Sequence, residues 1–565
     1  MEKIWKVIPT DPERVRLLQQ ALNIHPVFCS LLVQRGVSDY EEARQFFRPS
    51  LDHLHDPFLM ADMEGAVARL ETAIQNGERI LLYGDYDVDG TTAVALSYAF
   101  LSKYHSNLDY YIPDRYKEGY GVSMDGIDYA RQNGVSLIIA MDCGVKAIQQ
   151  VAFAKSHGID FIICDHHLPK ATLPEAVAVL DPKRPDCAYP YKELSGCGVV
   201  FKLCQAFAKS NDEAEASYLN LLDLLVVSIA CDIVPVTGEN RILAYYGLQR
   251  LNERKRLGLR ALLDLANRTG PLRISDIVFG IGPMINAAGR LADARLAVKL
   301  LLSENKNVAY EYAHNLNHYN RQRREFEKGI VREAAAMYEA LPDHETLKSL
   351  VLFQPGWHKG VVGIAAAKMV EQFYKPSIML TESNGKLVGS ARTVRGFDIH
   401  RAIQACEPLL DNFGGHVHAA GLTLRPENLG AFQEKFEAVV AAQLSPQMEI
   451  PEIAVAAEIP IEWIGSKFYK LLKQMAPFGP GNRNPVFVSR FVMDAGFSRV
   501  LKDSHLRLSI QRKGKEPIAA IAFGMGHLIE KVKSGAFHLC YTINENHWQG
   551  KKSLQLNVKD IQFPD

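Results

Sequence analysis

Three short apolar runs in this chain each end on an aspartate, and this feature limits the possible folds most. The runs and their polar ends are residues 81–84 with Asp85, residues 137–141 with Asp142, and residues 161–164 with Asp165, His166 and His167. Apolar runs of this length without polar alternation are typical of parallel strands covered on both faces. The chain is therefore expected to contain a parallel sheet of the α/β class, with acidic and imidazole groups where its strands end.

The polar ends of these strands are expected to meet in space. In an open parallel sheet, ligands bind beyond the carboxyl ends of the strands, which share one edge. Asp87 and Asp89 follow Asp85 closely, and Asp232 closes a further apolar stretch at residues 228–231. Carboxylates that crowd together need a cation between them. The pattern therefore predicts a metal site and favours a hydrolytic one.

Each aspartate also has a simpler interpretation. A single aspartate after a strand is usually a helix N-cap or a turn former. Asp181 follows the apolar residues 177–180 but precedes Pro182, so a turn role is at least as well supported there. Five carboxylates with two histidines at three strand ends are much harder to explain by caps and turns. The set as a whole favours the metal site.

Composition indicates a multidomain globular protein. A chain of 565 residues is too long for one hydrophobic core, and 47% hydrophobic with 23% charged residues is ordinary for globular proteins. No run approaches the ~18 consecutive apolar residues that a membrane helix needs. Nine cysteines without a CxxC pair indicate reduced thiols. We therefore expect a cytoplasmic protein that binds no membrane.

Charge is unevenly distributed although the net charge is zero. Residues 451–565 contain 16 Lys and Arg against 10 Asp and Glu, so this part carries a charge of +6. An acidic catalytic part joined to a basic part fits an anionic polymer that one region holds and another cuts. A solvated basic surface is the simpler alternative.

The pattern of elements along the chain predicts five segments. Residues 302–341 are highly charged and poor in glycine and proline, which favours a long exposed helix between two α/β units. The segments expected are 1–54 as a helical lead, 55–305 as a doubly wound α/β domain, 306–345 as a long connecting helix, 346–445 as a second, smaller α/β domain, and 455–565 as a β-barrel of the OB type.

Barrels of this type commonly bind single strands through a basic groove and aromatic stacking platforms. Most aromatic residues in strands belong to the core, so we expect only one or two of them to face a ligand. The candidates are the aromatic residues Phe487, Phe491, Phe523, Tyr541 and Trp548, and the basic residues Lys502, Arg507, Lys551 and Lys552.

In their order along the chain, the motifs resemble the DHH phosphoesterase superfamily, and within it the RecJ group of single-strand-specific exonucleases. The motifs are residues 85–90 (DYDVDG), 142–144 (DCG), 165–167 (DHH), Asp232, 282–290 (GPMINAAGR) and 414–421 (GGHVHAAG). The resemblance covers the chain from about residue 55 to its end. It implies a DHH catalytic domain, a DHH-associated substrate-binding domain and an OB-fold nucleic-acid-binding domain for the three predicted globular units.

The resemblance also implies an activity. We expect a 5′→3′ exonuclease specific for single-stranded DNA that releases mononucleotides by two-metal-ion catalysis, in DNA repair and recombination. Expected partners are single-stranded DNA and, by resemblance, a helicase and a single-strand-binding protein; we expect a monomer. One alternative is a DHH oligoribonuclease or small-substrate phosphodiesterase, but such members are about half this length and lack the barrel. A non-catalytic scaffold is disfavoured because the ligand set is nearly complete.

The metal ligands are expected to hold two divalent ions. Carboxylate and imidazole groups suit Mn²⁺ or Mg²⁺ better than a thiolate-binding ion. Many relatives carry a histidine where this chain has Tyr83, so we expect Asp85 to compensate. The expected ligands are Asp85, Asp87, Asp89, Asp142, His166 and Asp232.

Three residues are expected in catalytic roles, namely Asp85, Asp165 and His167. If the two histidines continue the extended chain, His167 should not point the same way as His166, because successive side chains alternate. We assign His167 to the scissile phosphate, as a cation or a general acid. The alternative is that His167 orients a carboxylate.

Further residues are expected to bind the substrate. Arg115 and Arg290 resemble family positions that grip phosphates, where a guanidinium fits well; surface salt bridges are the alternative. The other expected contacts are Ser390, Arg392, Gly415 and His416 in the second α/β domain, and Arg507 and Trp548 in the barrel.

Overall fold

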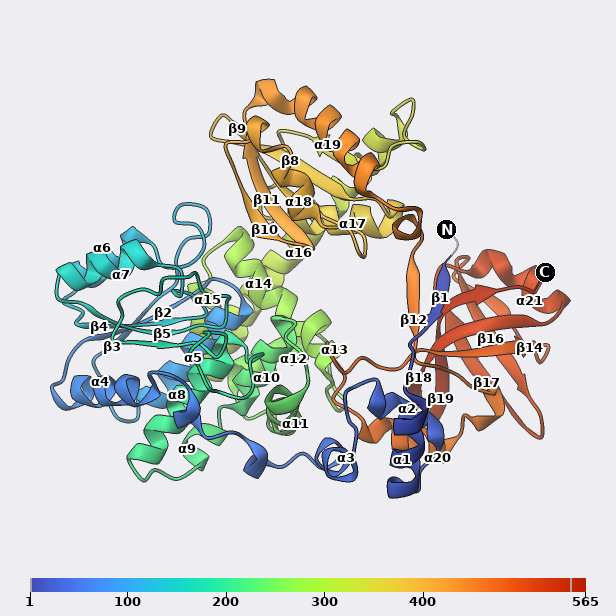
Figure 1. The fold of residues 1–565 in the computed structure, drawn as a ribbon, viewed down its shortest axis with the longest axis horizontal. Coiled ribbons are helices and arrows are strands. Elements are labelled where there is room, and N and C mark those ends of the chain that lie inside the picture. The colour runs from blue at the N-terminus through green and yellow to red at the C-terminus, as the bar shows by residue number, and fades with distance from the viewer. Residues whose placement is uncertain (1–2, 549–550, 565) are drawn as a thin grey trace.

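The structure is a computed structural model that describes residues 3–548 and 551–564. The ribbon forms three lobes (Figure 1): a parallel-sheet domain, a second α/β domain and a β-barrel domain. Among the described residues, no helix combines the length and the apolar character that crossing a bilayer requires.

The first lobe is built on the predicted parallel sheet. Its strands lie in the order β3-β2-β4-β5-β6, and every neighbouring pair is parallel. The strands are β2 (Ile80–Gly84), β3 (Leu108–Tyr111), β4 (Leu137–Met141), β5 (Asp160–Cys164) and β6 (Ala178–Leu180). The predicted α/β class is confirmed, and the absence of polar alternation has the expected cause, because helices cover both faces.

Alternate residues of each strand enter two different cores. Leu82 of β2 packs in one core with α4 (Met63–Gln75), α5 (Val88–Leu101) and α8 (Gly196–Ser210), whereas Leu81 packs in the other. That second core contains α6 (Met124–Gln132) and α7 (Ile148–Ser156), which cover the opposite face of the sheet. The lobe is completed by α9 (Ala216–Leu219), α10 (Leu222–Cys231), α11 (Gly238–Asn252), α12 (Leu257–Leu265), α13 (Ile274–Asp276), a π-helix (Ile277–Ile281), α14 (Gly282–Leu291) and α15 (Arg295–Leu301).

A single 34-residue helix, α16 (Lys306–Glu339), joins the first two lobes. Ala309, Ala313 and Leu316, in its first half, belong to the core of the parallel-sheet lobe. Ile330 and Ala334, in its second half, belong to a core of the second lobe. The two halves are therefore packed on different domains, which fixes the helix at both ends.

The second lobe has a mixed five-stranded sheet in the order β10-β11-β9-β8-β7. Only β7 and β8 pair in parallel. Its elements are β7 (Leu350–Phe353), α17 (Val362–Phe373), β8 (Ser377–Ser383), β9 (Lys386–Arg392), α18 (Ile399–Gln404), β10 (Asn412–His416), β11 (Ala419–Leu424) and α19 (Leu429–Gln443).

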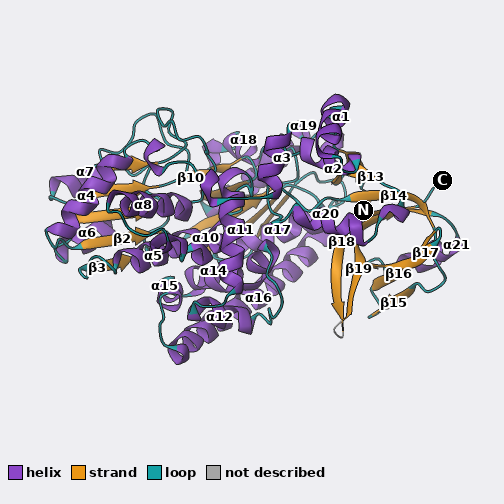
Figure 2. Ribbon diagram, turned by 90° about the horizontal axis from the view of Figure 1, so that it is seen from below, coloured by secondary structure: helices purple, strands orange, loops and turns teal. Residues whose placement is uncertain are grey.

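The third lobe is a seven-stranded sheet in the order β13-β14-β18-β19-β17-β16-β15, in which the long hairpin of β18 and β19 projects in Figure 2. Residues 506–510 alternate between buried and less buried positions, as the sequence predicts for a barrel strand. The elements are β13 (Ala457–Glu458), α20 (Ser466–Gln474), β14 (Phe487–Val492), β15 (Arg499–Leu501), β16 (His505–Arg512), β17 (Lys515–Ala522), α21 (Ile529–Ser534), β18 (Phe537–Trp548) and β19 (Lys551–Gln562).

The N-terminal segment packs on this third lobe. Its first strand, β1 (Ile4–Val7), pairs in parallel with β12 (Glu452–Val455). The helices α1 (Pro12–Leu22), α2 (Pro26–Val33) and α3 (Tyr40–Phe47) contribute Leu18, Phe28 and Ala43 to the barrel's core. The two ends of the chain are thus joined by one hydrophobic core. The domain limits drawn from the sequence stay predictions.

A buried ion pair anchors the segment that leads into the first lobe. Lys202 on α8 and Glu239 on α11 are 0% and 1% exposed, and Lys202 Nζ lies 2.8 Å from Glu239 Oε1. Glu239 also accepts hydrogen bonds from Tyr189 Oη (2.6 Å) and His55 N (2.9 Å). Lys202 donates to the carbonyl oxygen of His55 at 3.1 Å. Removal of either charge leaves the other buried without compensation.

We therefore expect Lys202→Met to lower the free energy of unfolding by about 3–5 kcal/mol, measured by urea denaturation followed by circular dichroism. The matched control is on the same helix, because Lys209 pairs with Asp56 where both side chains are about half exposed. Lys209→Met should change the stability by less than about 1 kcal/mol. Equal effects of the two substitutions would contradict a structural role for the buried pair.

Candidate metal centre

The strands of the parallel sheet place three aspartates at one edge, as the sequence predicts. Asp85 follows β2, Asp142 follows β4 and Asp165 follows β5. Asp142 adopts a left-handed conformation with φ 60°, which turns the chain sharply at the strand end. Asp87 is the N-cap of α5 and accepts hydrogen bonds from Asp89 N (2.8 Å) and Gly90 N (3.1 Å). That hydrogen-bonding role fixes the direction of the Asp87 carboxylate.

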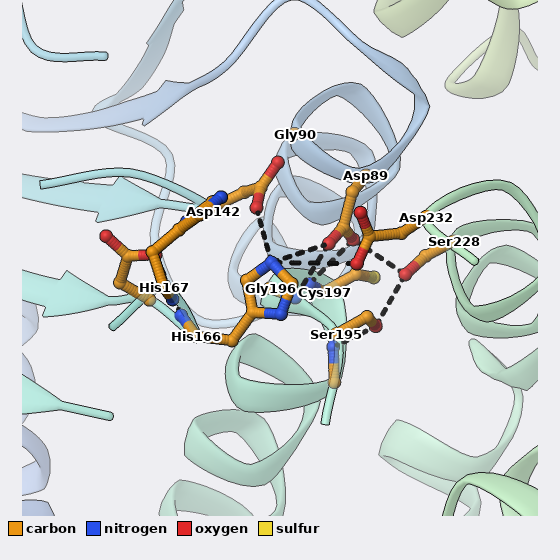
Figure 3. A network of polar contacts seen from close by, with 12 residues as sticks. Asp89, Gly90, Asp142, His166, His167, Ser195, Gly196, Cys197, Ser228 and Asp232 are labelled. Atoms are coloured by element: carbon orange, nitrogen blue, oxygen red, sulfur yellow. Dashed lines mark hydrogen bonds and ion pairs between the residues drawn. The ribbon is translucent and has the colours of Figure 1, made fainter. Parts of the chain in front are cut away.

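Asp89 is held by groups from two other helices (Figure 3). It accepts hydrogen bonds from the amides of Gly196 (2.7 Å) and Cys197 (2.9 Å) at the start of α8, and from Ser228 Oγ of α10 (2.6 Å). Ser228 Oγ is in turn 2.6 Å from Ser195 Oγ. These donors lock the orientation of a carboxylate that is 1% exposed.

His166 presents one ring nitrogen to the acidic cluster. Its Nδ1 lies 3.0 Å from the carbonyl oxygen of Leu194, which assigns the proton to Nδ1 and leaves Nε2 as an acceptor. Nε2 lies 3.2 Å from Asp142 Oδ1, 3.6 Å from Asp232 Oδ2 and 3.8 Å from Asp89 Oδ2. Asp232 directly follows α10, so its apolar run is a buried helix, not a strand.

The donor set fits divalent cations. Five buried atoms of the cluster have no hydrogen-bond partner, namely both carboxylate oxygens of Asp85, Asp142 Oδ1, His166 Nε2 and Asp232 Oδ2. Buried polar atoms left in this way need an explanation. Three groups bring one ligand atom each within 4.8 Å of one another: Asp85, Asp87 and Asp142; Asp89, His166 and Asp232; and Asp142, His166 and His167. Oxygen and imidazole ligands in this arrangement suit Mn²⁺ or Mg²⁺.

Crowding of the carboxylates raises their proton affinity. Burial, followed by the negative charges of neighbouring aspartates, raises the pKa of Asp142 and Asp232 well above the ordinary value. Burial and Asp87 do the same for the pKa of Asp85. Bound cations would compensate this negative charge.

Tyr83 is buried and hydrogen-bonded within the protein, so it is not available as a metal ligand. Its hydroxyl donates to the carbonyl oxygen of Gly121 at 3.0 Å and accepts from Ser123 N at 3.0 Å. The side chain is fully buried and its ring stacks on that of Tyr111. Asp85, with two unpartnered oxygens beside Asp87 and Asp142, is placed to contribute the ligand that Tyr83 does not.

The expectation that the two histidine rings point in opposite directions is wrong. Their centroids are 4.6 Å apart, because β5 ends at Cys164 and the chain is no longer extended. Asp165 accepts hydrogen bonds from Val145 N, His166 N and His167 Nδ1, at 2.9, 2.7 and 2.7 Å. These bonds hold the turn, so Asp165 acts here as a positioning residue.

Charge pairing sets the protonation of Asp165 and His167. Burial opposes both charges, but the mutual hydrogen bond and the attraction between the two charges, with the Val145 amide bond to Asp165, together outweigh it; the pKa of Asp165 is lowered to about 2 and the pKa of His167 is raised. The Tyr120 hydroxyl lies 3.2 Å from His167 Nε2 and donates to the carbonyl oxygen of Asp142 at 3.0 Å. A partly exposed imidazole, whose protonated form is favoured by Asp165, therefore stands at the edge of the acidic cluster.

Three of the predicted substrate-binding arginines form a cluster between the first two lobes. Burial and then the positive charges of Arg115, Arg323 and Arg392 lower the pKa of Arg290 to about 10. Arg290 donates to the carbonyl oxygen of Gly360 at 3.0 Å, and Arg392 donates to Ser390 Oγ at 2.8 Å. These acceptors are neutral, so the cluster keeps its positive charge available for an anion such as phosphate.

The remaining predicted contacts lie on β10 of the second lobe and in the barrel. Gly415 (φ 148°) and His416 are exposed on β10. Arg507 is exposed on β16, and the side chain of Trp548 lies outside the described residues. Of the other barrel aromatics, Phe487 and Tyr541 are fully buried, whereas Phe491 and Phe523 are 66% and 59% exposed. Phe491 and Phe523 are therefore accessible to a ligand, and the expectation that one or two aromatic residues face one stays a prediction.

Some supporting residues were not predicted from the sequence. The Gly196 and Cys197 amides and Ser228 all orient Asp89. A Cβ on Gly196 would lie 2.6 Å from Asp142 Cβ, so only glycine allows α8 to start there. The run Ser-Gly-Cys-Gly at 195–198 was an available signal for a tight helix start. Asp181, by contrast, accepts from Lys183 N at 2.7 Å, as expected for a turn residue.

Models of three protein families match this chain. They are the DHH family, N-terminal domain, at residues 79–229; the DHHA1 domain at residues 346–442; and the RecJ OB domain at residues 455–560. The matches fall on the three lobes and follow their order.

The chain is similar to proteins named single-stranded-DNA-specific exonuclease RecJ. It is 35% identical to the one from Bacillus subtilis over 98% of this chain and 70% of that protein. It is 34% identical to the one from Escherichia coli, over 95% of this chain and 96% of that protein. The crystal structure of RecJ from Thermus thermophilus in complex with Mn²⁺ matches with a TM-score of 0.85 at 26% identity, over 100% of this chain and 80% of that one. The Mg²⁺ complex gives a TM-score of 0.79.

The raised carboxylate pKa values predict how metal and pH act together on stability. At Asp85, Asp142 and Asp232 the metal-free folded state binds more protons than the unfolded chain, so the contribution of these groups to stability falls as the pH rises from the ordinary carboxylate value through the raised ones. Mn²⁺ takes the place of those protons. We expect added Mn²⁺ to raise Tm more at about pH 7.5 than at about pH 5.

The matched variant is Asp142→Asn, which removes one of the repelling charges. At neutral pH and without metal, this variant should unfold at a higher temperature than the wild type and gain less from Mn²⁺. A Tm increase with Mn²⁺ that is independent of pH, or equal in the variant, would contradict the cluster's electrostatics.

Proposed function

Because this chain belongs to the RecJ family of exonucleases, we propose that it degrades single-stranded DNA from the 5′ end to mononucleotides by metal-dependent phosphodiester hydrolysis. The observation that carries the proposal is the group of buried, unpartnered carboxylate and imidazole atoms at the strand ends. The 5′→3′ direction and a role in repair and recombination rest on the family resemblance.

The proposed chemistry assigns distinct tasks to the residues of the cluster. Asp85, Asp87, Asp89, Asp142, His166 and Asp232 would hold two divalent ions. When bound, such ions act as Lewis acids that stabilise the attacking and leaving oxygens of a phosphodiester. His167, held by Asp165 and partly exposed, is placed to donate a hydrogen bond to the scissile phosphate or a proton to the leaving oxygen.

The arginine cluster supports recognition of a strand end. Arg115 lies on the Tyr86 side of the acidic residues, with its guanidinium carbon 4.9 Å from the Tyr86 ring centroid. Arg392 and Ser390 come from the second lobe. A phosphate bound between them would be gripped by both domains while the next linkage lies toward the metal ligands. This arrangement supports cleavage from a phosphorylated end.

An exposed face of the barrel supports binding of the polymer. Arg507 of β16 pairs directly with Arg499 of β15, and both side chains are exposed. His505, on the same side of β16 as Arg507, packs edge-on against the exposed Phe523 with ring centroids 5.2 Å apart. Positive charge beside an exposed aromatic ring is the combination that holds single strands. We call Arg499, His505, Arg507 and Phe523 the barrel face.

The alternative of a small-substrate phosphodiesterase makes no use of the barrel face, and the family of this chain weighs against it.

The remaining expectations concern the cellular compartment, the oligomeric state and the protein partners. All nine cysteines are free thiols, which supports work in a reducing cytoplasm. A monomer that acts with a helicase and a single-strand-binding protein is proposed from resemblance.

The first test is the metal mechanism. With Mn²⁺ or Mg²⁺, the wild type should digest end-labelled single-stranded DNA that carries a 5′-phosphate faster than DNA with a 3′-phosphate, and should leave a blunt duplex intact. Asp142→Ala should lower kcat by at least about 10³-fold, because this carboxylate belongs to two of the three candidate ligand groups. Asp128→Ala, on an exposed pair with Arg131, is the matched control and should have wild-type activity. Equal activity in Asp142→Ala and wild type would refute the mechanism.

The second test separates a polymer exonuclease from a small-substrate enzyme. Deleting the barrel would also remove the core on which α1–α3 pack, so substitutions are needed. We expect Arg507→Ala with Phe523→Ala to weaken binding of a long single strand at least about tenfold, since a stacked base contributes ~1–3 kcal/mol. Hydrolysis of a 5′-phosphorylated trinucleotide should be unchanged. Unchanged binding of the long strand, measured by fluorescence anisotropy, would favour the small-substrate alternative.

A further inference from the structure

The loop that carries Asp232 is supported by a turn from the C-terminal part of the chain. Val236 N, four residues after Asp232, donates a hydrogen bond to the carbonyl oxygen of Pro480 at 2.7 Å. We infer that the turn at residues 477–481, here called the brace turn, positions Asp232 for metal binding, with Gly479 as its positioning residue. The inference rests on the proposed function, because it takes Asp232 as a metal ligand.

The loop after Asp232 has a strained backbone that its own residues do not stabilise. Ile233 has φ 62°, a left-handed conformation that is unfavourable for a β-branched residue. Its side chain is 67% exposed, so burial of this residue does not offset the strain. Contacts further along the loop must therefore determine its path. On the side of the first lobe, Tyr191 Oη (3.1 Å) and Asn240 Nδ2 (3.0 Å) donate to the carbonyl oxygen of Pro235.

The brace turn is rigid enough to support this loop. Asn482 Nδ2 donates to the carbonyl oxygens of Met475 and Pro477, both at 2.9 Å. Arg241, on α11 of the first lobe, donates to the carbonyl oxygens of Met475 and Ala476 at 3.0 Å. Arg35 from the N-terminal segment donates to Asn482 Oδ1 at 2.6 Å. Residues from three parts of the chain thus fix the turn, and Arg241 ties it to the first lobe.

The contact between turn and loop is close because the turn contains glycines. A Cβ on Gly479 would lie 2.4 Å from Val236 Cγ2 and 3.3 Å from Val236 Cβ. A Cβ on Gly481 would lie 2.9 Å from the methyl group of Thr237. Val236 is fully buried, so it cannot move into solvent to make room. Any side chain at 479 therefore has to push the loop back toward Asp232 or push the turn away.

The functional consequence is that the metal site depends on the third lobe. Asp232 Oδ2 lies 3.6 Å from His166 Nε2 and has no hydrogen-bond partner, so nothing in its immediate surroundings holds this oxygen in place. Its position depends on the end of α10 and on the loop that follows. Residues that support metal ligands typically change metal affinity 10–100-fold when they are altered.

The test measures Mn²⁺ binding to the full-length, metal-free protein by isothermal titration calorimetry. We expect Gly479→Ala to weaken Mn²⁺ binding at least about tenfold. Val236→Ala combined with Gly479→Ala should restore most of the affinity, because the alanine then fills the space of the lost methyl groups. Gly465→Ala is the matched control, since a Cβ there meets nothing within 4 Å and φ is −163°. It should bind Mn²⁺ as the wild type does.

Each outcome bears on the inference. Wild-type Mn²⁺ affinity in Gly479→Ala would overturn it, and so would a loss of affinity that the double variant fails to reverse. If Gly479→Ala does not fold, Val236→Ala alone decides: the gap it opens should weaken Mn²⁺ binding several-fold, and unchanged affinity would overturn the inference. Failure of the proposed function gives a different result: the wild type would bind Mn²⁺ but digest no single-stranded DNA. The Mn²⁺ affinities of the wild type and the variants could then still be compared.

Discussion

Mutual repulsion among buried carboxylates is the constraint on which the rest of this structure depends. Asp89 and Asp142 are almost inaccessible to solvent, and Asp85 carries two unpartnered oxygens beside them. Such an arrangement is unfavourable without a counter-charge, so the fold has to hold the groups in place before a cation arrives. Hydrogen bonds provide that hold: the amides at the start of α8 fix Asp89, and the Leu194 carbonyl orients His166.

The part of the site that the sequence predicts follows from local physics. An unbroken apolar run such as residues 137–141 marks a buried parallel strand, and strands of one sheet end at one edge. Asp85, Asp142 and Asp165 were therefore placed together without knowledge of the intervening helices. Asp232 was also recognised, but not its context, because the ten-residue helix α10 is buried nearly all round and has no polar face to give a helical period.

The part that the sequence does not predict depends on contacts between distant segments. The support of Asp89 by Ser228 requires the packing of α5 against α10, which no local pattern encodes. The N-terminal helices look like a separate lead segment in sequence, yet Phe28 and Leu18 share a core with barrel strands more than 400 residues away. The adjacent rings of His166 and His167 depend on where β5 stops, and alternation along an extended strand gave the wrong direction.

These long-range contacts make the catalytic centre a property of the whole chain. The candidate acidic metal ligands come from the parallel-sheet lobe, whereas Ser390 and Arg392, proposed to bind phosphate, come from the second lobe. Arg290 links these two lobes directly, since it donates to the carbonyl oxygen of Gly360 across their boundary. The two halves of α16 are packed into different cores, so a change in the angle between the lobes has to bend or unpack that helix. Packing therefore opposes an opening motion that would separate the arginine cluster from the candidate metal ligands.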